Sequence, residues 1–199
     1  DFRLHMGPLF SLEQALGLSE EVRVFNGDTH RIGQCLRQAH IRRGKGVFPV
    51  KVLDRNDAPD IAGKHLAKPD SRVVGMVGAG TQARTQLMAL SRFFRIEQVI
   101  VSDQSIERAQ SFERDARRFL DCDYQLTTSP KDACNCDILV TTTPARSPVV
   151  KDAWINPGTH INAIGADAKG KQELESSLTK RAKVVVDDIV QAMHSGEVN

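Results

Sequence analysis

Val73–Ala83, with the sequence VVGMVGAGTQA, is the stretch that decides the fold. Its first five residues are mostly apolar and predict a strand, and the apolar spacing of Gln82–Phe94 predicts a helix directly after it. Between them lies a Gly-x-Gly-x-x-Ala element, in which Gly78 permits a tight turn and Gly80 lets a pyrophosphate approach the backbone. The N-terminus of the helix offers N–H groups and the positive end of its dipole to phosphates. The order of strand, glycine turn and helix therefore predicts a dinucleotide-binding site.

The same alternation of apolar runs and amphipathic stretches continues through residues 71–199. The expected strands are Val73–Val77, Val99–Val101, Tyr124–Thr127, Ile138–Val140, His160–Ile164 and Val184–Val186. The expected helices are Gln82–Phe94, Ile106–Phe119 with Ser105 as its N-cap, and a short helix that opens at Ser129 and Pro130. Right-handed crossovers convert this order into an α/β fold, a doubly wound Rossmann domain with a mostly parallel sheet.

Residues 1–70 predict a partial α+β unit that precedes this domain. Its expected elements are a short helix at Ser11–Gly17, a helix at Asp28–Gly44, a strand at Val47–Leu53 and a helix that begins at Pro59. We therefore predict two domains, residues 1–70 and residues 71–199. The chain opens on Asp1 rather than Met, so we expect a fragment of a longer protein.

The composition is that of an ordinary soluble globular protein, with 40% hydrophobic and 26% charged residues. The formal net charge of +2 is too small to predict a nucleic-acid or membrane partner, and no apolar run approaches the roughly 20 residues of a membrane span. Four cysteines in 199 residues do not form a disulfide scaffold, which favours a reducing, cytoplasmic compartment. Cys134 and Cys136 lack the second pair of ligands that a zinc site needs, so no metal is expected and Cys136 is expected in the core.

Asp103 ends the second expected strand, 23 residues after Gly80. A carboxylate at about this spacing binds the hydroxyls of the adenosine ribose in dinucleotide-binding domains. A 2′-phosphate at the same place would meet its negative charge, so the sequence favours NAD over NADP, with Asp103 and its neighbour Gln104 at the ribose. The alternative is an ordinary glycine turn with an acidic loop residue.

From Ser71 to Asn199 the chain also resembles a known family. The residues that carry the resemblance are Gly78–Ala83, Asp137–Pro144, Gly158–Asp167, Gly170–Leu174 and Val185–Asp188, followed by His194, Gly196 and Glu197. These motifs are similar to those of the ornithine cyclodeaminase/mu-crystallin family and, within it, to the archaeal-type alanine dehydrogenases. The resemblance implies NAD, a small amino-acid substrate and a homodimer, with residues 1–70 as part of a substrate and dimerisation domain.

The resemblance also implies which residues contact the cofactor. The expected contacts are Thr81 and Gln82 at the phosphates, Ala163, Ile164 and Gly165 beside the nicotinamide ribose, and Thr142, Thr143 and Lys171 nearby. Threonine is also simply common in strands, and a lysine such as Lys171 is often a solvated helix residue.

Members of this family oxidise an amino acid at its α-carbon, which requires a group that moves protons near the amine. Asp167 is the candidate for this group, because it follows an expected strand at the carboxyl edge of the sheet, where such folds bind ligands. The alternative is a helix cap for a turn that starts near Lys171. Arg3 and Arg55 are candidate clamps for the substrate carboxylate, or else ordinary surface arginines. The family's lysine in a Gly-x-Lys stretch of the first domain has no clear counterpart here.

Three functions remain open at this point. The first is an NAD-dependent oxidoreductase of the alanine dehydrogenase type, in which water attacks the imine and ammonia departs. The second is an ornithine cyclodeaminase, in which the side-chain amine attacks the imine and the hydride returns. The third belongs to another class, a dinucleotide- or small-ligand-binding protein without turnover, of the mu-crystallin type.

Overall fold

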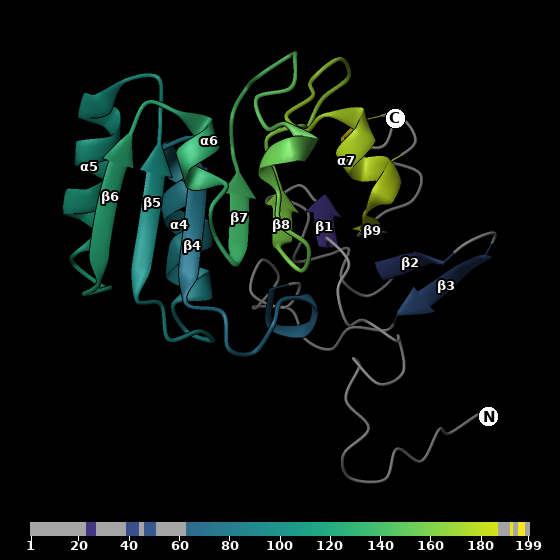
Figure 1. Ribbon diagram of the computed structural model, residues 1–199, viewed down its shortest axis with the longest axis horizontal. Helices are drawn as coiled ribbons and strands as arrows, with labels where there is room; N and C mark the ends of the chain where they lie inside the picture. Colours follow the sequence, from purple (N-terminus) through teal and green to yellow (C-terminus); the bar gives the residue numbers. More distant parts are fainter. Residues whose placement is uncertain are drawn as a thin grey trace, which may run out of the picture.

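The computed structural model describes residues 23–26, 39–43, 46–50, 63–186, 192 and 195–197, with side chains described for the last three of these segments. Within these residues, nine strands form one sheet in the order β3-β2-β9-β1-β8-β7-β4-β5-β6 (Figure 1). The strands are β1 (Arg23–Asn26), β2 (Ala39–Arg43), β3 (Gly46–Val50), β4 (Val73–Val77), β5 (Gln98–Ser102), β6 (Asp123–Thr127), β7 (Ile138–Thr141), β8 (His160–Ala163) and β9 (Lys183–Val186).

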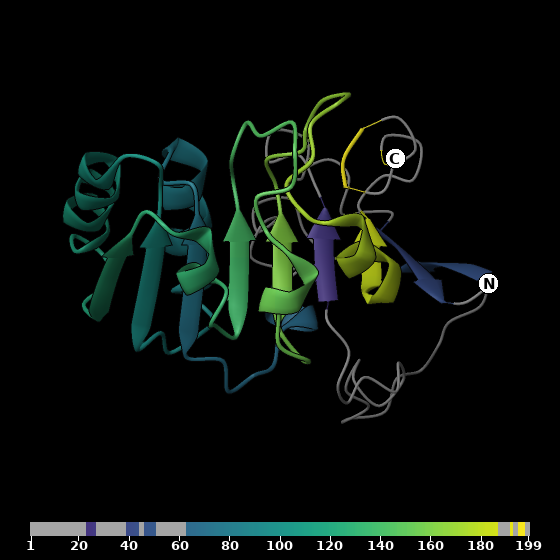
Figure 2. The same cartoon turned by 45° about the horizontal axis from the view of Figure 1, so that its top comes forward.

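Parallel pairing dominates the sheet, and only β2 runs against its neighbours β3 and β9. The arrowheads of β7, β8 and β1 accordingly point the same way in Figure 2. β4 lies between β5 and β7, so the chain turns outward in opposite directions from this strand. Open α/β sheets bind ligands outside the carboxyl ends of the strands at such a switch point.

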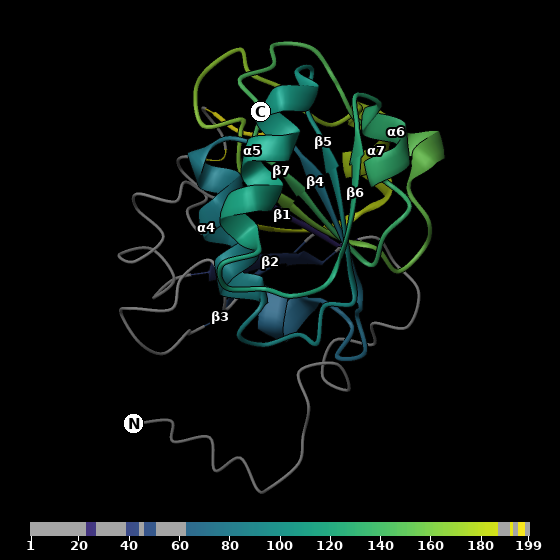
Figure 3. The same cartoon turned by 90° about the vertical axis from the view of Figure 1, so that its left-hand side faces the viewer.

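Helices cover both faces of the sheet (Figure 3). α4 (Thr81–Leu90) and α5 (Ile106–Ala116) lie on one face, and α6 (Pro130–Ala133) and α7 (Ser176–Arg181) lie on the other. The short 3-10 helix η2 (Asp152–Trp154) packs with α6 and α7. Each face has its own apolar core, because successive strand residues point to opposite sides.

The alternation within the strands divides these two cores. Met76 and Val140 belong to the cluster under α4 and α5, together with Leu87 and Phe112. The neighbouring residues Val77 and Leu139 belong to the cluster on the α6 and α7 face. Both faces of β4 and β7 are therefore buried, which explains why these strands are continuously apolar in sequence.

The structure confirms the expected α/β fold and the strands predicted after residue 71, now β4 to β9. Ser105 is confirmed as the N-cap of α5, since its hydroxyl accepts a hydrogen bond of 3.3 Å from the Arg108 amide. Two helices are shorter than predicted: α4 ends at Leu90 and α5 at Ala116. Turns follow both helices, and their apolar residues, such as Phe94, still pack into the core.

The helix predicted for residues 28–44 is wrong in its last part, because Ala39–Arg43 forms strand β2. Its residues pair with β3 from Ala39 opposite Val50 to Arg43 opposite Gly46. The apolar residues in this stretch, Ala39 and Ile41, fit a two-residue period as well as a helical one, and pairing with two strands decides between them.

The other predictions for residues 1–70 have different outcomes. The predicted strand is confirmed as β3, and the predicted third helix is helical over residues 63–66. The helix predicted near residues 11–17 lies outside the described residues. β1, β2 and β3 extend the same sheet as the later strands, and the division into two domains at residue 70 stays a prediction. In the described segments, no helix is long and apolar enough to cross a bilayer.

Gly75 provides a direct test of the packing between β4 and α6. A Cβ atom at this position would lie 1.9 Å from the Ala133 carbonyl oxygen and 2.9 Å from Cys136 Sγ. We therefore expect Gly75→Ala to lower the free energy of unfolding by about 3 kcal/mol, because the helix must move off the sheet. Urea denaturation measures this loss.

Gly80→Ala is the matched control for this prediction. A Cβ at Gly80 meets no atom within 4 Å, and the backbone φ of −79° suits alanine. Its free energy of unfolding should stay within about 1 kcal/mol of the parent. Equal losses in the two variants would contradict the close contact between β4 and α6.

Candidate functional site

The glycine turn after β4 has the geometry that the sequence predicts. Gly78 has a φ of +97°, a backbone conformation that residues with a side chain rarely adopt. Its amide donates a 2.8 Å hydrogen bond to the Ser102 carbonyl of β5. A Cβ here would also lie 3.0 Å from the Thr142 carbonyl oxygen. Both the backbone angle and the contact with the residue after β7 therefore require glycine.

At Gly80, neither the backbone angle nor a contact within the described residues requires glycine. The space around its Cβ position is open, and it is the N-cap of α4 without a side-chain hydrogen bond to the helix. The first turn of α4 carries no acidic residue. An open approach to the N–H groups at a helix N-terminus suits an anion, and a pyrophosphate fits this part of the structure.

Asp103 lies beside this turn, directly after β5. Its carboxylate accepts a 2.9 Å hydrogen bond from the Ala79 amide and a 3.0 Å hydrogen bond from the Ser105 amide. The structure thus brings Asp103 to the glycine turn, as the sequence spacing predicts, with exposed Gln104 next to it. Its contact with a ribose stays a prediction.

Arg84 is a residue of this region that the sequence analysis missed. Its guanidinium donates to the Ala79 carbonyl at 2.7 Å and to the Gly80 carbonyl at 3.0 Å. Asp115 of α5 holds the same side chain through a 2.8 Å ion pair. Arg84 therefore ties the carbonyls of Ala79 and Gly80 to α5. The only sequence signal is an arginine just after the fingerprint alanine, Ala83.

The ends of β7 and β8 form the second half of the edge. Thr142 contacts the glycine turn, since its amide donates to Val77 at 2.9 Å and its hydroxyl to the Gly78 carbonyl at 3.3 Å. Ala163, by contrast, points its side chain into the apolar core on the α7 face. Only its backbone lies in the strand end, so the expected contact beside a ribose cannot involve the Ala163 side chain.

Asp167 lies on a loop, four residues beyond the end of β8 at Ala163. Its Oδ1 atom pairs with Lys171 Nζ at 2.5 Å, and the two side chains are 48% and 24% exposed. No helix begins near Lys171, and α7 starts only at Ser176. The alternative roles of Asp167 as a helix cap and of Lys171 as a solvated helix residue are therefore wrong; the two form an ion pair at the carboxyl edge.

Two buried carboxyl groups lie close to this edge and were also missed. Glu173 is 0% exposed and accepts hydrogen bonds from Thr141, Thr143 and Gly165. Burial raises the pKa of Glu173 above its usual value, although these hydrogen bonds act in the opposite direction. Glu197 accepts from the Glu173 amide at 2.6 Å and the Leu174 amide at 3.0 Å. Burial raises the pKa of Glu197 to about 7.

The remaining candidates lie away from this edge or outside the described residues. Arg3 and Arg55 belong to the latter group, so the structure does not place them. Cys136 is buried, as predicted, and His160 is fully buried within β8. In residues 63–186, 192 and 195–197, no group of three or more His, Cys, Asp or Glu side chains is arranged to hold a metal ion.

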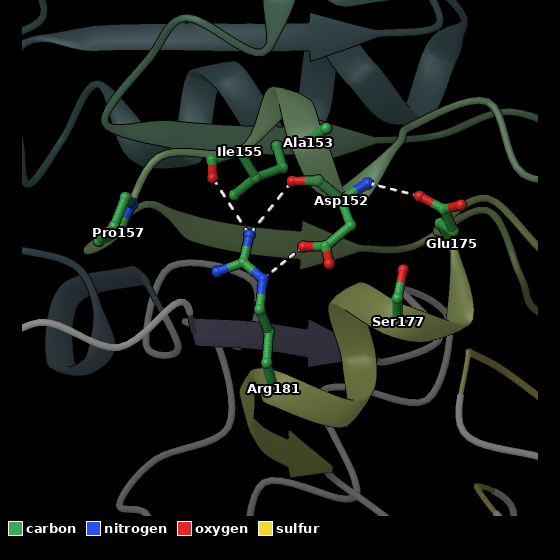
Figure 4. A pocket seen from close by; sticks show the side chains of 7 residues that line it. All are labelled: Asp152, Ala153, Ile155, Pro157, Glu175, Ser177 and Arg181. Atoms are coloured by element: carbon green, nitrogen blue, oxygen red, sulfur yellow. Dashed lines mark hydrogen bonds and ion pairs between the residues drawn. The ribbon is translucent and has the colours of Figure 1, made fainter.

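A separate hollow of about 540 Å³ lies between η2 and α7 (Figure 4). Arg181 crosses it, pairs with Asp152 and donates to the Ile155 carbonyl at 3.1 Å. Glu175 accepts from the Asp152 amide at 2.8 Å on the other side. These charged groups are engaged with the protein itself, so the carboxyl edge remains the candidate site.

The doubly wound sheet, the glycine turn and Asp103 at the next strand together define a dinucleotide-binding domain of the Rossmann type. A family model places the chain more closely: residues 55–199 match the ornithine cyclodeaminase/mu-crystallin family. The chain belongs to this family.

Curated relatives carry several enzyme names. Alanine dehydrogenase of Archaeoglobus fulgidus is 46% identical over 161 residues, which cover 76% of this chain and 49% of the relative. L-lysine cyclodeaminase of Streptomyces rapamycinicus is 36% identical over 140 residues, 69% of this chain and 40% of the relative. The chain spans about half the length of the curated relatives it matches.

Solved structures of family members also resemble this chain. An archaeal alanine dehydrogenase dimer with bound NAD has a TM-score of 0.68 and 48% identity, and the match covers 71% of this chain and 44% of that chain. The Delta(1)-pyrroline-2-carboxylate reductase of Thermococcus litoralis, in complex with NADH and L-proline, has a TM-score of 0.60 and 39% identity, covering 62% and 38%. These likenesses confirm the fold and the family that the motifs predict.

Glu197 leads to a prediction about pH. Because its pKa is raised to about 7 in the folded protein, the folded state binds more protons than the unfolded state between pH 4.5 and 7. The contribution of Glu197 to stability is therefore fully present below pH 4.5 and is lost as the pH rises through 7. Over this range the parent should lose on the order of 3 kcal/mol of unfolding free energy relative to Glu197→Gln, since one pKa unit corresponds to roughly 1.4 kcal/mol.

Urea denaturation at several pH values measures this difference. Glu175→Gln is the control, because it makes the same change at a carboxyl two residues from Glu173. Its pH profile should parallel that of the parent. A Glu197→Gln profile that also parallels the parent would show that Glu197 ionises normally.

Proposed function

We propose that this chain is part of an NAD-dependent oxidoreductase that acts on the α-carbon of a small L-amino acid, of the alanine dehydrogenase type. The observation that carries the proposal is that the expected cofactor residues and the candidate proton-transfer residue lie at the same edge of the sheet. The glycine turn with Asp103 and the loop with Asp167 follow parallel strands of one sheet, so both lie at its carboxyl edge. A cofactor at the glycine turn would extend toward the Asp167 loop.

The geometry of this edge supports the proposed cofactor contacts. The amides at the start of α4 would hold the pyrophosphate, and Asp103 would accept hydrogen bonds from the adenosine ribose. Gly80 leaves room for the phosphates because its Cβ position is open. Thr143 and Gly165, at the ends of β7 and β8, would flank the nicotinamide half. When bound, NAD supplies an acceptor for the hydride from the α-carbon.

Asp167 would handle the proton in this reaction. Lys171 holds its Oδ1 atom, and the second oxygen, Oδ2, would accept a proton from the amine or from the attacking water. The ion pair keeps the carboxylate in one orientation and supplies a positive charge beside it. Arg3 and Arg55 remain the proposed clamps for the substrate carboxylate.

Similar proteins support this reaction class. A segment 46% identical to a named alanine dehydrogenase covers 76% of the chain, and a structure 48% identical is an alanine dehydrogenase with NAD. A cyclodeaminase is the second candidate, because L-lysine cyclodeaminase is 36% identical over a similar segment. A binding protein without turnover is not favoured, since the rat relative is named ketimine reductase mu-crystallin.

We further propose a cytoplasmic homodimer. The archaeal alanine dehydrogenase structure that resembles this chain is a dimer. Cys122, Cys134 and Cys136 are free thiols, which suits a reducing compartment. Light scattering after size-exclusion chromatography would measure the mass of the assembly, and a monomer at micromolar concentration would contradict the dimer.

Asp103 determines the expected choice of cofactor. NAD should bind more tightly than NADP to the parent chain, because the carboxylate repels a 2′-phosphate. In Asp103→Ser, this preference should shrink or reverse. Calorimetric titration of both cofactors into both proteins measures it. Equal affinities of the parent for NAD and NADP would exclude the assigned role of Asp103.

Asp167→Asn tests the proton-transfer role. The amide keeps the shape of the side chain but cannot accept the proton, so we expect turnover to fall by about 10²-fold or more while NAD affinity stays nearly unchanged. Asp121→Asn, at an exposed position just before β6, is the control and should leave both unchanged. Full turnover in Asp167→Asn would place the base elsewhere.

One assay separates the two candidate functions. Formation of NADH with L-alanine supports the dehydrogenase, whereas formation of proline from ornithine without net NADH supports the cyclodeaminase. A chain that binds NAD but turns over no member of an amino-acid panel would contradict both.

A further inference from the structure

Glu173 is a fully buried carboxyl group in a position that the cofactor motif does not explain. It lies in the segment between the Asp167 loop and α7, where Leu174 forms an isolated parallel bridge with Val150. Its side chain reaches the ends of β7 and β8. A buried carboxylate is stable only where hydrogen-bond donors surround it.

Four donors meet this carboxylate. Oε2 accepts from the Thr141 hydroxyl at 2.7 Å and from the Gly165 amide at 2.8 Å. Oε1 accepts from the Thr143 amide at 2.5 Å and from the Thr143 hydroxyl at 2.7 Å. One side chain therefore connects the last residue of β7, the loop after it and the first turn after β8.

The approach of Gly165 to this group is close. A Cβ at Gly165 would lie 2.6 Å from Glu173 Oε1 and 2.2 Å from the Thr143 carbonyl oxygen. The backbone of Gly165 has no positive φ, so contact, and not conformation, explains the glycine. The ends of β7 and β8 can converge on the carboxylate only because this side chain is missing.

The backbone of Glu173 is itself held from two sides. Glu197 accepts from the Glu173 amide at 2.6 Å, and the Glu173 carbonyl accepts from the amides of Val149 and Val150 at 2.8 and 3.0 Å. The carboxylate is therefore fixed to the protein rather than carried on a mobile loop. The Thr143 and Gly165 groups that donate to the carboxylate are therefore held in place as well.

We propose that Glu173 is a positioning residue that fixes Thr143 and Gly165 for the nicotinamide half of the cofactor. The inference rests on the proposed function, because it takes these two residues as cofactor contacts. Glu173 does not touch the cofactor in this proposal. It keeps two strand ends in register, so that the space between them is formed before the cofactor arrives.

A purely structural role would give a different result, and fragments of the cofactor distinguish the two. ADP-ribose contains the half that the glycine turn and Asp103 would hold, but lacks nicotinamide. In Glu173→Gln, the side chain keeps its size but loses one acceptor oxygen, so that donors lose a partner. The dissociation constant for NAD should rise about tenfold, while that for ADP-ribose changes less than about twofold.

Hydrogen exchange provides a readout that needs no cofactor. The amides of Thr143 and Gly165 should exchange faster in Glu173→Gln than in the parent, whereas the amides of α4 should exchange at the same rate in both. Glu175→Gln is the matched control, since Glu175 also accepts a backbone hydrogen bond but from Asp152, in the hollow of Figure 4. It should change neither the exchange at these amides nor either dissociation constant.

The results distinguish a failure of the proposed function from a failure of the positioning role of Glu173. A parent chain that binds neither NAD nor ADP-ribose overturns the proposed function, and the role of Glu173 toward a cofactor falls with it. A parent that binds both, with equal weakening of both in Glu173→Gln, overturns the positioning role alone. If Glu173→Gln does not fold, Thr141→Val is the alternative, because it removes one donor from the same carboxylate. In that variant, a ratio of the dissociation constants for NAD and ADP-ribose equal to that of the parent would also overturn the proposal.

Discussion

The parallel pairing of β4 with β5 on one side and β7 on the other is the constraint on which the site depends. Parallel strands end at the same edge, so the residues that follow β4, β5 and β7 must meet there. The contacts of Gly78 with Ser102 and Thr142 are direct consequences of this pairing. Because helices bury both faces of the sheet, its edge is the natural place for a large polar ligand.

Carboxylates that accept hydrogen bonds from backbone amides recur at the strand ends. Asp137 accepts from the amides of Arg72 and Val73 at the amino edge, and Asp103 and Glu173 accept from amides just beyond strands at the carboxyl edge. Where strands end, amides lose their partners in the sheet, and a short acidic side chain replaces them. The same chemistry that would bind ribose hydroxyls thus also builds the scaffold.

The sequence predicts local relationships well and distant ones poorly. Gly78, Gly80 and Asp103 are recognisable because the turn and the next strand end are separated by one helix of fixed length. Glu173 could not be predicted, because its partner Thr141 lies 32 residues away with no fixed spacing between them. Ala39–Arg43 was predicted as helix because five residues cannot distinguish the two periods without knowledge of the pairing. The cofactor contacts themselves remain predictions, although the structure places most of these residues at one edge.

The position of β1 has a consequence for how the chain reaches its fold. β1 lies between β8 and β9, and Arg23 pairs with His160, 137 residues later in the chain. At synthesis rates of about 5–20 residues per second, roughly 7 to 27 s pass before its first partner strand is made. The pairs among β4, β5 and β6 close much shorter loops and can form earlier. β1 is therefore translated before every other described strand, yet its backbone has no native strand partner until β8 has been made.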